Sequence, residues 1–136
     1  MERRDLIKDQ IEQLGRVFGA ILARFLGTKA AGNLTEGIEI ANESLQSQLD
    51  LDVDLILTLD TPELKEYLAQ RKLSSEHLET LADYFIAWAD STAANPKKAR
   101  TLYQTVLRLY DIIDDWSDLY SLARFEKEKQ IRKLLQ

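Results

Sequence analysis

The chain has 136 residues, of which 45% are hydrophobic and 30% charged, and it contains five Gly, two Pro and no Cys. This composition is too hydrophobic for a disordered chain and too poor in helix breakers for a low-complexity or all-β protein, and without Cys it excludes disulfides and thiolate metal sites. The net charge of −5 argues against a nucleic-acid partner, because phosphate binding requires clustered Lys and Arg. We therefore expect an acidic, all-α protein that folds as one helical domain over residues 1–136.

The least polar stretch of the chain is too short to cross a membrane. Residues 17–26 include Arg24 and fall far short of the ~20 apolar residues that a spanning helix needs. The preceding residues 2–16 hold four acidic and four basic side chains, unlike the positively charged start of a signal peptide. We therefore expect a cytoplasmic protein that neither crosses nor binds a membrane.

Charge is distributed unevenly along the chain. Residues 31–95 carry thirteen acidic and three basic side chains, whereas the segments on either side each have a small basic excess. The acidic middle either attracts the basic ends of the same chain or forms a surface for a basic partner. We favour the first interpretation, because solvated charge runs are common.

The first predicted helix covers residues 2–26. Its apolar side chains recur at steps of three and four residues and so share one face: Ile7, Ile11, Leu14, Phe18, Ile21 and Phe25. A second stripe consists of the small residues Gly15, Gly19 and Ala23. It predicts a neighbouring helix that approaches closely over the missing side chains, because Gly inside a helix otherwise costs about 1 kcal/mol. Gly27 and Gly32 are expected to end the helix and permit a turn.

Capping residues divide the middle of the chain. A helix is predicted over residues 34–49, and Asn33 has capping-box spacing to Glu36 at its start. Residues 54–59 are expected to form a short helical turn. Thr61 is then expected to cap a helix that begins at Pro62, where a missing amide hydrogen costs nothing. Ser74 or Ser75 opens the next helix, which runs to about residue 91.

The helix that begins at Pro96 carries two apolar stripes, so we expect other helices to cover it on two sides. The stripes consist of Leu102, Val106, Leu109, Ile113 and Trp116, and of Ala99, Tyr103, Leu107 and Tyr110. Four aspartates within residues 111–118, followed by Ser121 as a cap, favour a break near 115–121 and a last helix over 121–135. One long helix is the alternative, because no Gly or Pro follows Pro96 and the first stripe continues through Tyr120 and Ala123.

Residues 78–106 resemble the two helices of a tetratricopeptide repeat. Large, large, small and aromatic residues lie on the first helix, and Ala and an aromatic residue lie on the second: Leu78, Leu81, Ala82, Phe85, Ala99, Tyr103 and Val106. The loop is about five residues longer than the 34-residue period allows, and Asp111 lies near the place of the closing Pro. The resemblance covers one repeat and implies stacked helical hairpins, in a right-handed array of six to seven helices.

The chain is also similar to a small bacterial family of uncharacterised helical proteins that run into a tetratricopeptide-like hairpin. The similarity lies in residues 4–15, in residues 49–52 and in the closing helix over 121–134. It implies a cytoplasmic protein without an assigned activity, and it transfers no catalytic residues.

An enzymatic alternative comes from carboxylates at helical spacing. Glu36 with Glu39, and Glu76 with Glu79, repeat an E-x-x-E pattern that all-α nucleotide pyrophosphohydrolases use to hold magnesium. The pattern is frequent by chance in a chain with 23 acidic residues, and no E-x-x-D completes the set. His77, the single histidine, is expected at the surface or in a cap rather than in a catalytic or metal site.

We expect a non-enzymatic interaction domain that needs no cofactor and presents a groove to a peptide, a helix or a second copy of itself. Aromatic residues beside aspartates have the composition of an interaction hot spot, and the candidates for partner binding are Tyr110, Asp114, Trp116, Asp118 and Tyr120. The first helix, with its glycine stripe, is the expected interface of a homodimer.

Overall fold

The computed structural model describes the backbone of residues 3–136 and the side chains of residues 8–136. Seven helices and no strand lie in this range: α1 (Arg3–Ala30), α2 (Leu34–Leu49), α3 (Val53–Ile56), α4 (Thr61–Gln70), α5 (Ser75–Asp90), α6 (Pro96–Trp116) and α7 (Leu122–Leu134). The predicted all-α class is therefore confirmed. No helix within the described range has the length and apolar character that a membrane span requires. Glu2 and the side chain of Ile7, both named in the sequence prediction, lie outside the described residues.

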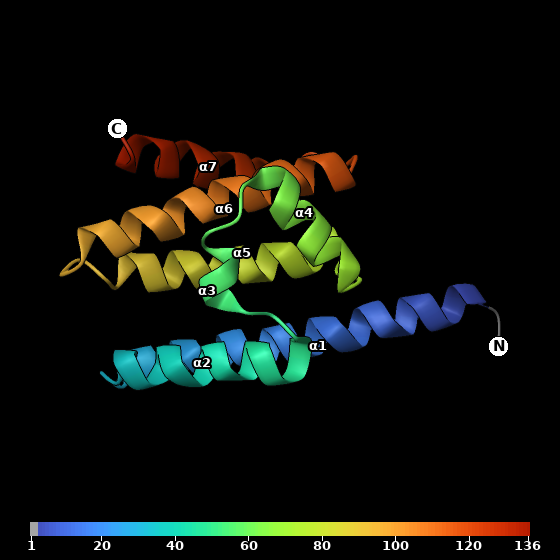
Figure 1. The fold of residues 1–136 in the computed structure, drawn as a ribbon, viewed down its shortest axis with the longest axis horizontal. Helices are drawn as coiled ribbons and strands as arrows, with labels where there is room; N and C mark the ends of the chain where they lie inside the picture. Colours follow the sequence, from blue (N-terminus) through green and yellow to red (C-terminus); the bar gives the residue numbers. More distant parts are fainter. Residues whose placement is uncertain (1–2) are drawn as a thin grey trace.

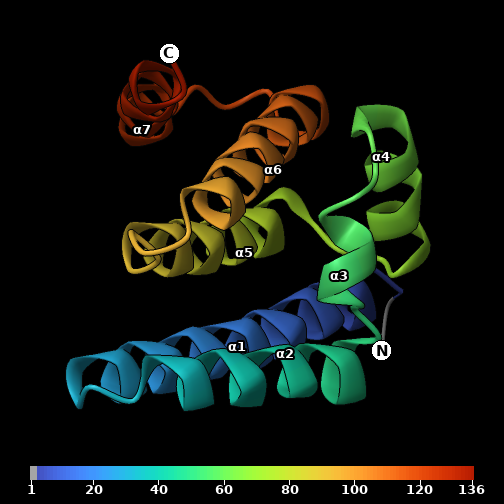
Figure 2. The same cartoon turned by 60° about the vertical axis from the view of Figure 1, so that its left-hand side comes forward.

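The helices are arranged as two hairpins with three additional helices around them (Figure 1). Helices α1 and α2 form one hairpin, α5 and α6 form the other, and α5 packs against α1. Helix α3 contacts α2, and α4 packs against α6. Figure 2 shows α4 and α7 on opposite sides of α6. Helix α6 thus contacts α4, α5 and α7, as its two apolar stripes predicted.

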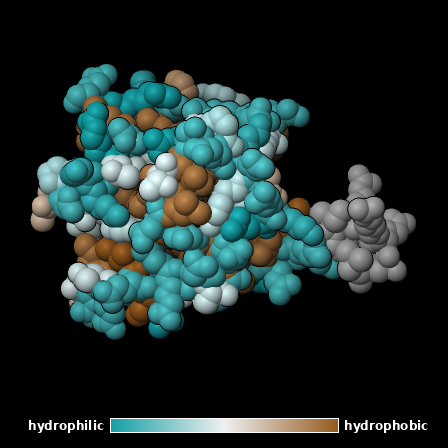
Figure 3. Space-filling model, viewed as in Figure 1, coloured by the Kyte–Doolittle hydropathy of each residue, from teal (hydrophilic) through white to brown (hydrophobic). Residues whose placement is uncertain are grey.

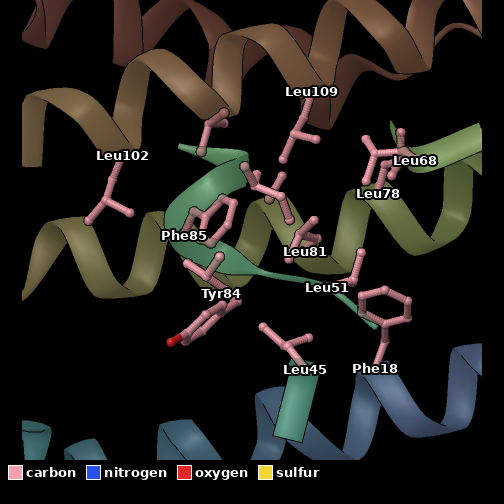
Figure 4. Close-up of a cluster of buried hydrophobic side chains, with 14 of the residues drawn as sticks. Phe18, Leu45, Leu51, Leu68, Leu78, Leu81, Tyr84, Phe85, Leu102 and Leu109 are labelled. Atoms are coloured by element: carbon pink, nitrogen blue, oxygen red, sulfur yellow. The ribbon is translucent and has the colours of Figure 1, made fainter. Parts of the chain in front are cut away.

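The hydrophobic core lies on both sides of α5. Phe18 of α1 and Leu45 of α2 approach α5 from one side, while Leu102 and Leu109 of α6 approach it from the other (Figure 4). Leu51, which precedes α3, is fully buried in the same cluster. On the face shown in Figure 3, hydrophilic side chains cover most of the surface, with small hydrophobic areas between them.

Helix α1 is one turn longer than predicted. Gly27 lies inside the helix instead of ending it, and the turn comes at Gly32, whose φ of +84° is in the left-handed region that favours Gly. The amide of Asn33 donates to the carbonyl of Thr28 and closes this turn. A helix tolerates one exposed Gly, so Gly27 was a weaker stop signal than the pattern suggested.

Two predicted caps are wrong in detail. Asn33 precedes α2 at the expected place, but its side chain makes no capping hydrogen bond, so the capping box with Glu36 is absent. Helix α4 is capped by Asp60 and not by Thr61: the Asp60 side chain accepts from the amide of Glu63, and the Glu63 side chain accepts from the amide of Asp60. Asp forms the stronger cap here because its carboxylate also interacts favourably with the helix dipole.

The remaining boundaries agree with the sequence prediction. Ser74 precedes α5, Asn95 caps α6 ahead of Pro96, and Ser121 caps α7 by accepting from the amide of Arg124 at 3.1 Å. The break between α6 and α7 covers residues 117–121, so the alternative of one long helix is wrong for this structure.

The close helix–helix approach occurs at a glycine that the pattern did not single out. A Cβ on Gly37 of α2 would lie 3.1 Å from two carbon atoms of Thr28 on α1. A Cβ on Gly15 would only come into ordinary contact with His77, at 4.0 Å, and no described atom comes that close to a Cβ on Gly19. Of the predicted stripe, only Gly15 therefore faces a neighbouring helix, whereas Gly19 and Ala23 are exposed.

Candidate functional site

The candidate site is the corner where α6 ends and α7 begins. Residues 117–121 form a linker without helical structure, with extended backbone at Ser117 and Ser121. Around this linker lie four large apolar side chains that solvent reaches: Leu119 is 80% exposed, Tyr120 74%, Leu122 63% and Phe125 47%. The rings of Tyr120 and Phe125 lie 6.3 Å apart, so these residues are neighbours in space as well as in sequence. We call these four residues the linker patch.

Helix α7 is held against the rest of the molecule chiefly by charged side chains. The guanidinium of Arg124 donates to Glu79 of α5 at 2.6 Å and to Asp114 of α6 at 3.0 Å, and it also donates to the carbonyl of Leu119 at 3.3 Å. Lys127 donates to Asp83 of α5 at 3.0 Å. We call Glu79, Asp83 and Asp114 the acidic cradle of α7. These pairs support the interpretation in which the acidic middle of the chain attracts its basic end.

Arg124 is buried, although it carries a full charge. Burial works to lower the pKa of Arg124, but its hydrogen bonds with Glu79 and Asp114 outweigh this effect and raise the pKa above its ordinary value. The cation therefore stays charged in place and fixes the start of α7 at the junction of α5 and α6.

Two carboxylates, Asp111 of α6 and Glu128 of α7, interact electrostatically across the boundary between these helices. Burial, with a contribution from Glu128 of α7, raises the pKa of Asp111 on α6, while Arg132 acts in the opposite direction. Arg132 is itself paired with Glu128 at 2.9 Å in an exposed contact. Glu128 of α7 therefore repels the charged form of Asp111, and Arg132 of the same helix offsets part of this repulsion.

Apolar packing contributes little to the attachment of α7. Ile131 is its one buried hydrophobic residue, and seven of the thirteen residues of the helix are charged. A helix in a globular protein ordinarily buries a stripe of three or four apolar residues for every two turns. Helix α7 therefore lacks the apolar stripe that secures the other long helices.

The five residues predicted to bind a partner are divided by the structure. Tyr120 and Asp118 are exposed in the linker, and Trp116 is half-buried beside it at the end of α6. Asp114 is exposed but occupied by Arg124. The prediction for Tyr110 is wrong: this side chain is fully buried, because it lies on the face of α6 that packs into the core.

Tyr110 adds a polar atom to the same junction. Its hydroxyl has no hydrogen-bond partner among the described residues. Burial raises its pKa, with contributions from the nearby carboxylates of Asp83 and Glu79. The phenol therefore stays neutral next to the acidic cradle.

The sequence did not single out Leu119, Leu122, Phe125 or Arg124. The three apolar residues give a signal that could have been read, because they lie within or just after the predicted break, where large apolar side chains are unexpected. The role of Arg124 depends on Glu79, which is 45 positions away, and no local pattern marks such a pair.

The carboxylates of the enzymatic alternative do not form a common site. Glu36 and Glu39 are exposed on α2, and Glu76 is exposed on α5, whereas Glu79 is half-buried and paired with Arg124. No cluster of three or more His, Asp or Glu suited to a metal ion occurs in the described part of the chain. The E-x-x-E pattern thus places three carboxylates in solvent and the fourth in an ion pair, and it does not bring the four together.

His77 connects two helices in the core instead of lying at the surface. Its Nδ1 accepts from the amide of Ser74 at 2.9 Å, which caps α5 as expected. With Nδ1 as the acceptor, Nε2 carries the proton and donates to the carbonyl of Ile11 on α1 at 2.8 Å. The ring also stacks on Phe18, with centroids 5.5 Å apart. His77 is therefore a structural link between α1 and α5.

A groove of about 870 Å³ lies between α1, the end of α2 and the turn before α5. Arg71, which lines it, is already engaged: its guanidinium lies over the Tyr67 ring at 3.6 Å and pairs with Asp50 at 3.3 Å. Apart from Arg71 and the exposed Lys72, the described residues that line the groove are apolar or neutral. The neutral polar residues are Gln10, Gln13, Gln48 and Ser74, so the lining combines amide and hydroxyl groups with apolar side chains.

Comparison with known proteins gives no match to a protein-family model, to a curated protein or to a solved structure.

Proposed function

We propose that this chain is a non-catalytic protein-interaction or scaffolding domain, and that it binds a peptide, a helix or a second copy of itself at the linker patch. The observation that carries the proposal is the exposure of four large apolar side chains within residues 119–125 at the α6–α7 corner, where the rings of Tyr120 and Phe125 are neighbours. Contiguous exposed apolar residues with polar residues around them are typical of protein interaction surfaces. Aromatic residues such as Tyr120 and Phe125 also contribute strongly to binding where they occur in such surfaces.

The surroundings of the linker patch favour a partner with basic groups near an apolar face. Asp118 lies within the linker, and Asp115 at the end of α6 is exposed, although Lys65 pairs with it. Elsewhere the exposed large apolar residues are separate: Leu26 lies on α1, Leu55 on α3 and Leu134 at the end of α7. Single exposed apolar residues are normal and need no partner.

The proposal includes a tetratricopeptide-like arrangement of the two hairpins. It is supported by the pairing of α5 with α6 and by the burial of Leu78, Leu81, Ala82 and Phe85 at the motif positions. Helices α3 and α4 lie between the two hairpins in the chain, whereas in a regular repeat array one hairpin follows the next directly. We therefore regard α5 and α6 as one degenerate repeat rather than as part of a continuous array. The proposal also places the protein in the cytoplasm.

Self-association through α1 is also part of the proposal. Gly19 and Ala23 are exposed on α1, and Leu26 is 44% exposed one turn further on. Small residues allow two helices to approach closely. A second copy is thus a suitable occupant for this face.

Selection of peptides from a displayed random library tests the proposed binding surface. We expect enriched peptides that bind the natural chain and lose at least tenfold in affinity for a Leu119→Ser/Phe125→Ser variant. A Leu55→Ser variant is the matched control, because Leu55 is 42% exposed on α3, outside the patch. Peptides that bind both variants equally well, or a library without enrichment, would contradict the proposal.

A thermal-shift panel tests the non-catalytic part. A ligand that binds only the folded state raises the melting temperature. We expect magnesium, manganese and nucleoside triphosphates to leave the melting temperature unchanged. A shift with magnesium that disappears in a Glu36→Gln/Glu76→Gln variant would instead support the pyrophosphohydrolase alternative.

A further inference from the structure

We infer that α7 is an exchangeable helix, and that two copies of this chain form a dimer in which each α7 occupies the acidic cradle of the other copy. This inference rests on the proposed function, in which a second copy is one of the partners. It names the segment that crosses over and the surface that receives it.

The first argument is the charge complementarity between α7 and its cradle. Helix α7 contains five basic and two acidic side chains, whereas the cradle consists of Glu79, Asp83 and Asp114. These ion pairs form equally well with the α7 of a second copy, because an exchanged helix makes the same contacts. Apart from Ile131, little buried apolar surface ties α7 to its own chain.

The second argument is the nature of the linker. Its five residues hold no Gly or Pro, and one of its internal hydrogen bonds joins the amide of Leu119 to the hydroxyl of Ser117 at 3.2 Å. The linker side chains Leu119 and Tyr120 lie mostly in solvent, so straightening this segment removes little packing. The apolar stripe of α6 also continues in helical phase through Tyr120 and Ala123. The linker is thus able to extend α6 and carry α7 away from its own cradle.

The third argument is the unsatisfied group at the same junction. The hydroxyl of Tyr110 is buried without a described partner next to Glu79 and Asp83. A buried polar group without a partner weakens the packing around it. The packing of α6 at this junction therefore includes one hydroxyl whose hydrogen bond is not made within the described residues.

Isotope mixing with the natural chain distinguishes exchange from docking within one chain. Unlabelled and ¹⁵N-labelled chains are mixed in equal amounts, held at high concentration to allow exchange, and the dimer, of twice the 15.6 kDa chain mass, is isolated. A carbodiimide then converts the ion pair between Asp83 and Lys127 into an amide. In an exchanged dimer, about half of these cross-linked peptide pairs combine one light and one heavy peptide.

Cross-links that contain only light or only heavy pairs would overturn the inference, and so would the absence of any dimer. A second experiment mixes an Arg124→Glu chain with a Glu79→Lys/Asp114→Lys chain, since each has a mismatched cradle by itself. We expect the mixture to form a one-to-one dimer in which both α7 helices are protected from amide exchange. The chain that carries all three substitutions is the control, because its cradle and α7 match again and its folding shows that the substitutions are tolerated.

The two proposals fail separately. Mixed cross-links in the natural chain, together with a library that yields no peptide dependent on the linker patch, would leave the exchange and remove the patch as a peptide site. Peptide binding that depends on the linker patch, without mixed cross-links, would leave the patch as a peptide site and remove the exchange of α7.

Discussion

Replacement of Arg124 by Met measures how strongly the charged contacts hold α7. The substitution keeps an unbranched apolar stem and removes the ion pairs with Glu79 and Asp114. Breaking a fully buried ion pair costs about 3–5 kcal/mol. Glu79 is 33% exposed and Asp114 55%, so both carboxylates regain water when the cation is lost. We therefore expect a smaller cost, of about 2 kcal/mol in the free energy of α7 opening.

Limited proteolysis with a Lys-specific protease is the assay, because Lys127 and Lys129 lie in α7 and are unchanged in the variant. When α7 opens and closes faster than the protease cleaves, the cleavage rate follows the population of the open form. A change of about 2 kcal/mol then corresponds to a roughly 30-fold higher cleavage rate. An Arg132→Met variant is the control, since it removes an exposed pair with Glu128 that is worth about 0.3–0.5 kcal/mol. Equal cleavage rates in the two variants would refute the view that the acidic cradle holds α7.

Three further predictions concern the packing and the titrating groups. Gly19→Ala should raise the free energy of unfolding by about 0.5–1 kcal/mol, because the new Cβ meets no described atom within 4 Å. Gly37→Ala should lower the free energy of unfolding, because the new Cβ would lie 3.1 Å from Thr28. Urea titrations of both variants compare the two effects. Burial and the hydrogen bond to Asp90 raise the pKa of Tyr103 from 10.0 to about 12, so the folded state retains this proton longer than the unfolded state. Stability should therefore fall as pH rises from 10 towards 12, and a Tyr103→Phe variant should show a shallower fall in alkaline melts. Because burial and Glu128 raise the pKa of Asp111, its charge destabilises the folded state at neutral pH; Asp111→Asn should raise the melting temperature at pH 7 and have no effect below pH 3.8.

Much of the fold could be predicted because its signals are local. Apolar spacing identified each of the long helices, and Ser121 together with the aspartates of residues 111–118 marked the break before α7. The caps were harder, since Asn33 and Asp60 both lie at plausible capping positions and only the second uses its side chain. Local spacing shows which residues are able to cap, whereas packing decides which of them do so.

The candidate site was predicted only in part because it depends on contacts between distant residues. Tyr120 and Tyr110 were both candidates because aromatic residues lie near aspartates here, but Tyr120 is exposed in the linker whereas Tyr110 faces the core. The buried position of His77 depends on its contact with Ile11, 66 residues earlier, and the pattern around it resembles an ordinary cap. Pairings across such distances are set by the topology of the helices, which the sequence periodicity does not determine.

The glycines illustrate the same dependence on topology. A small residue at a four-residue step is compatible with a close approach but does not show from which side a neighbour comes. Gly19 lies on the exposed face of α1, whereas Gly37 meets Thr28 across the α1–α2 hairpin. The sequence pattern did not contain the identity of the residue that packs against each glycine.

The most direct test of the central claim, that α7 is attached mainly by ion pairs and opens by itself, is amide hydrogen exchange of the natural chain. We predict that the amides of Leu122–Leu134 exchange at least ten times faster than those in the middle of α5 and α6, and faster again at high ionic strength. Exchange of α7 at the same rate as α5 and α6, unchanged by salt, would mean that α7 unfolds only with the whole molecule and would contradict this account.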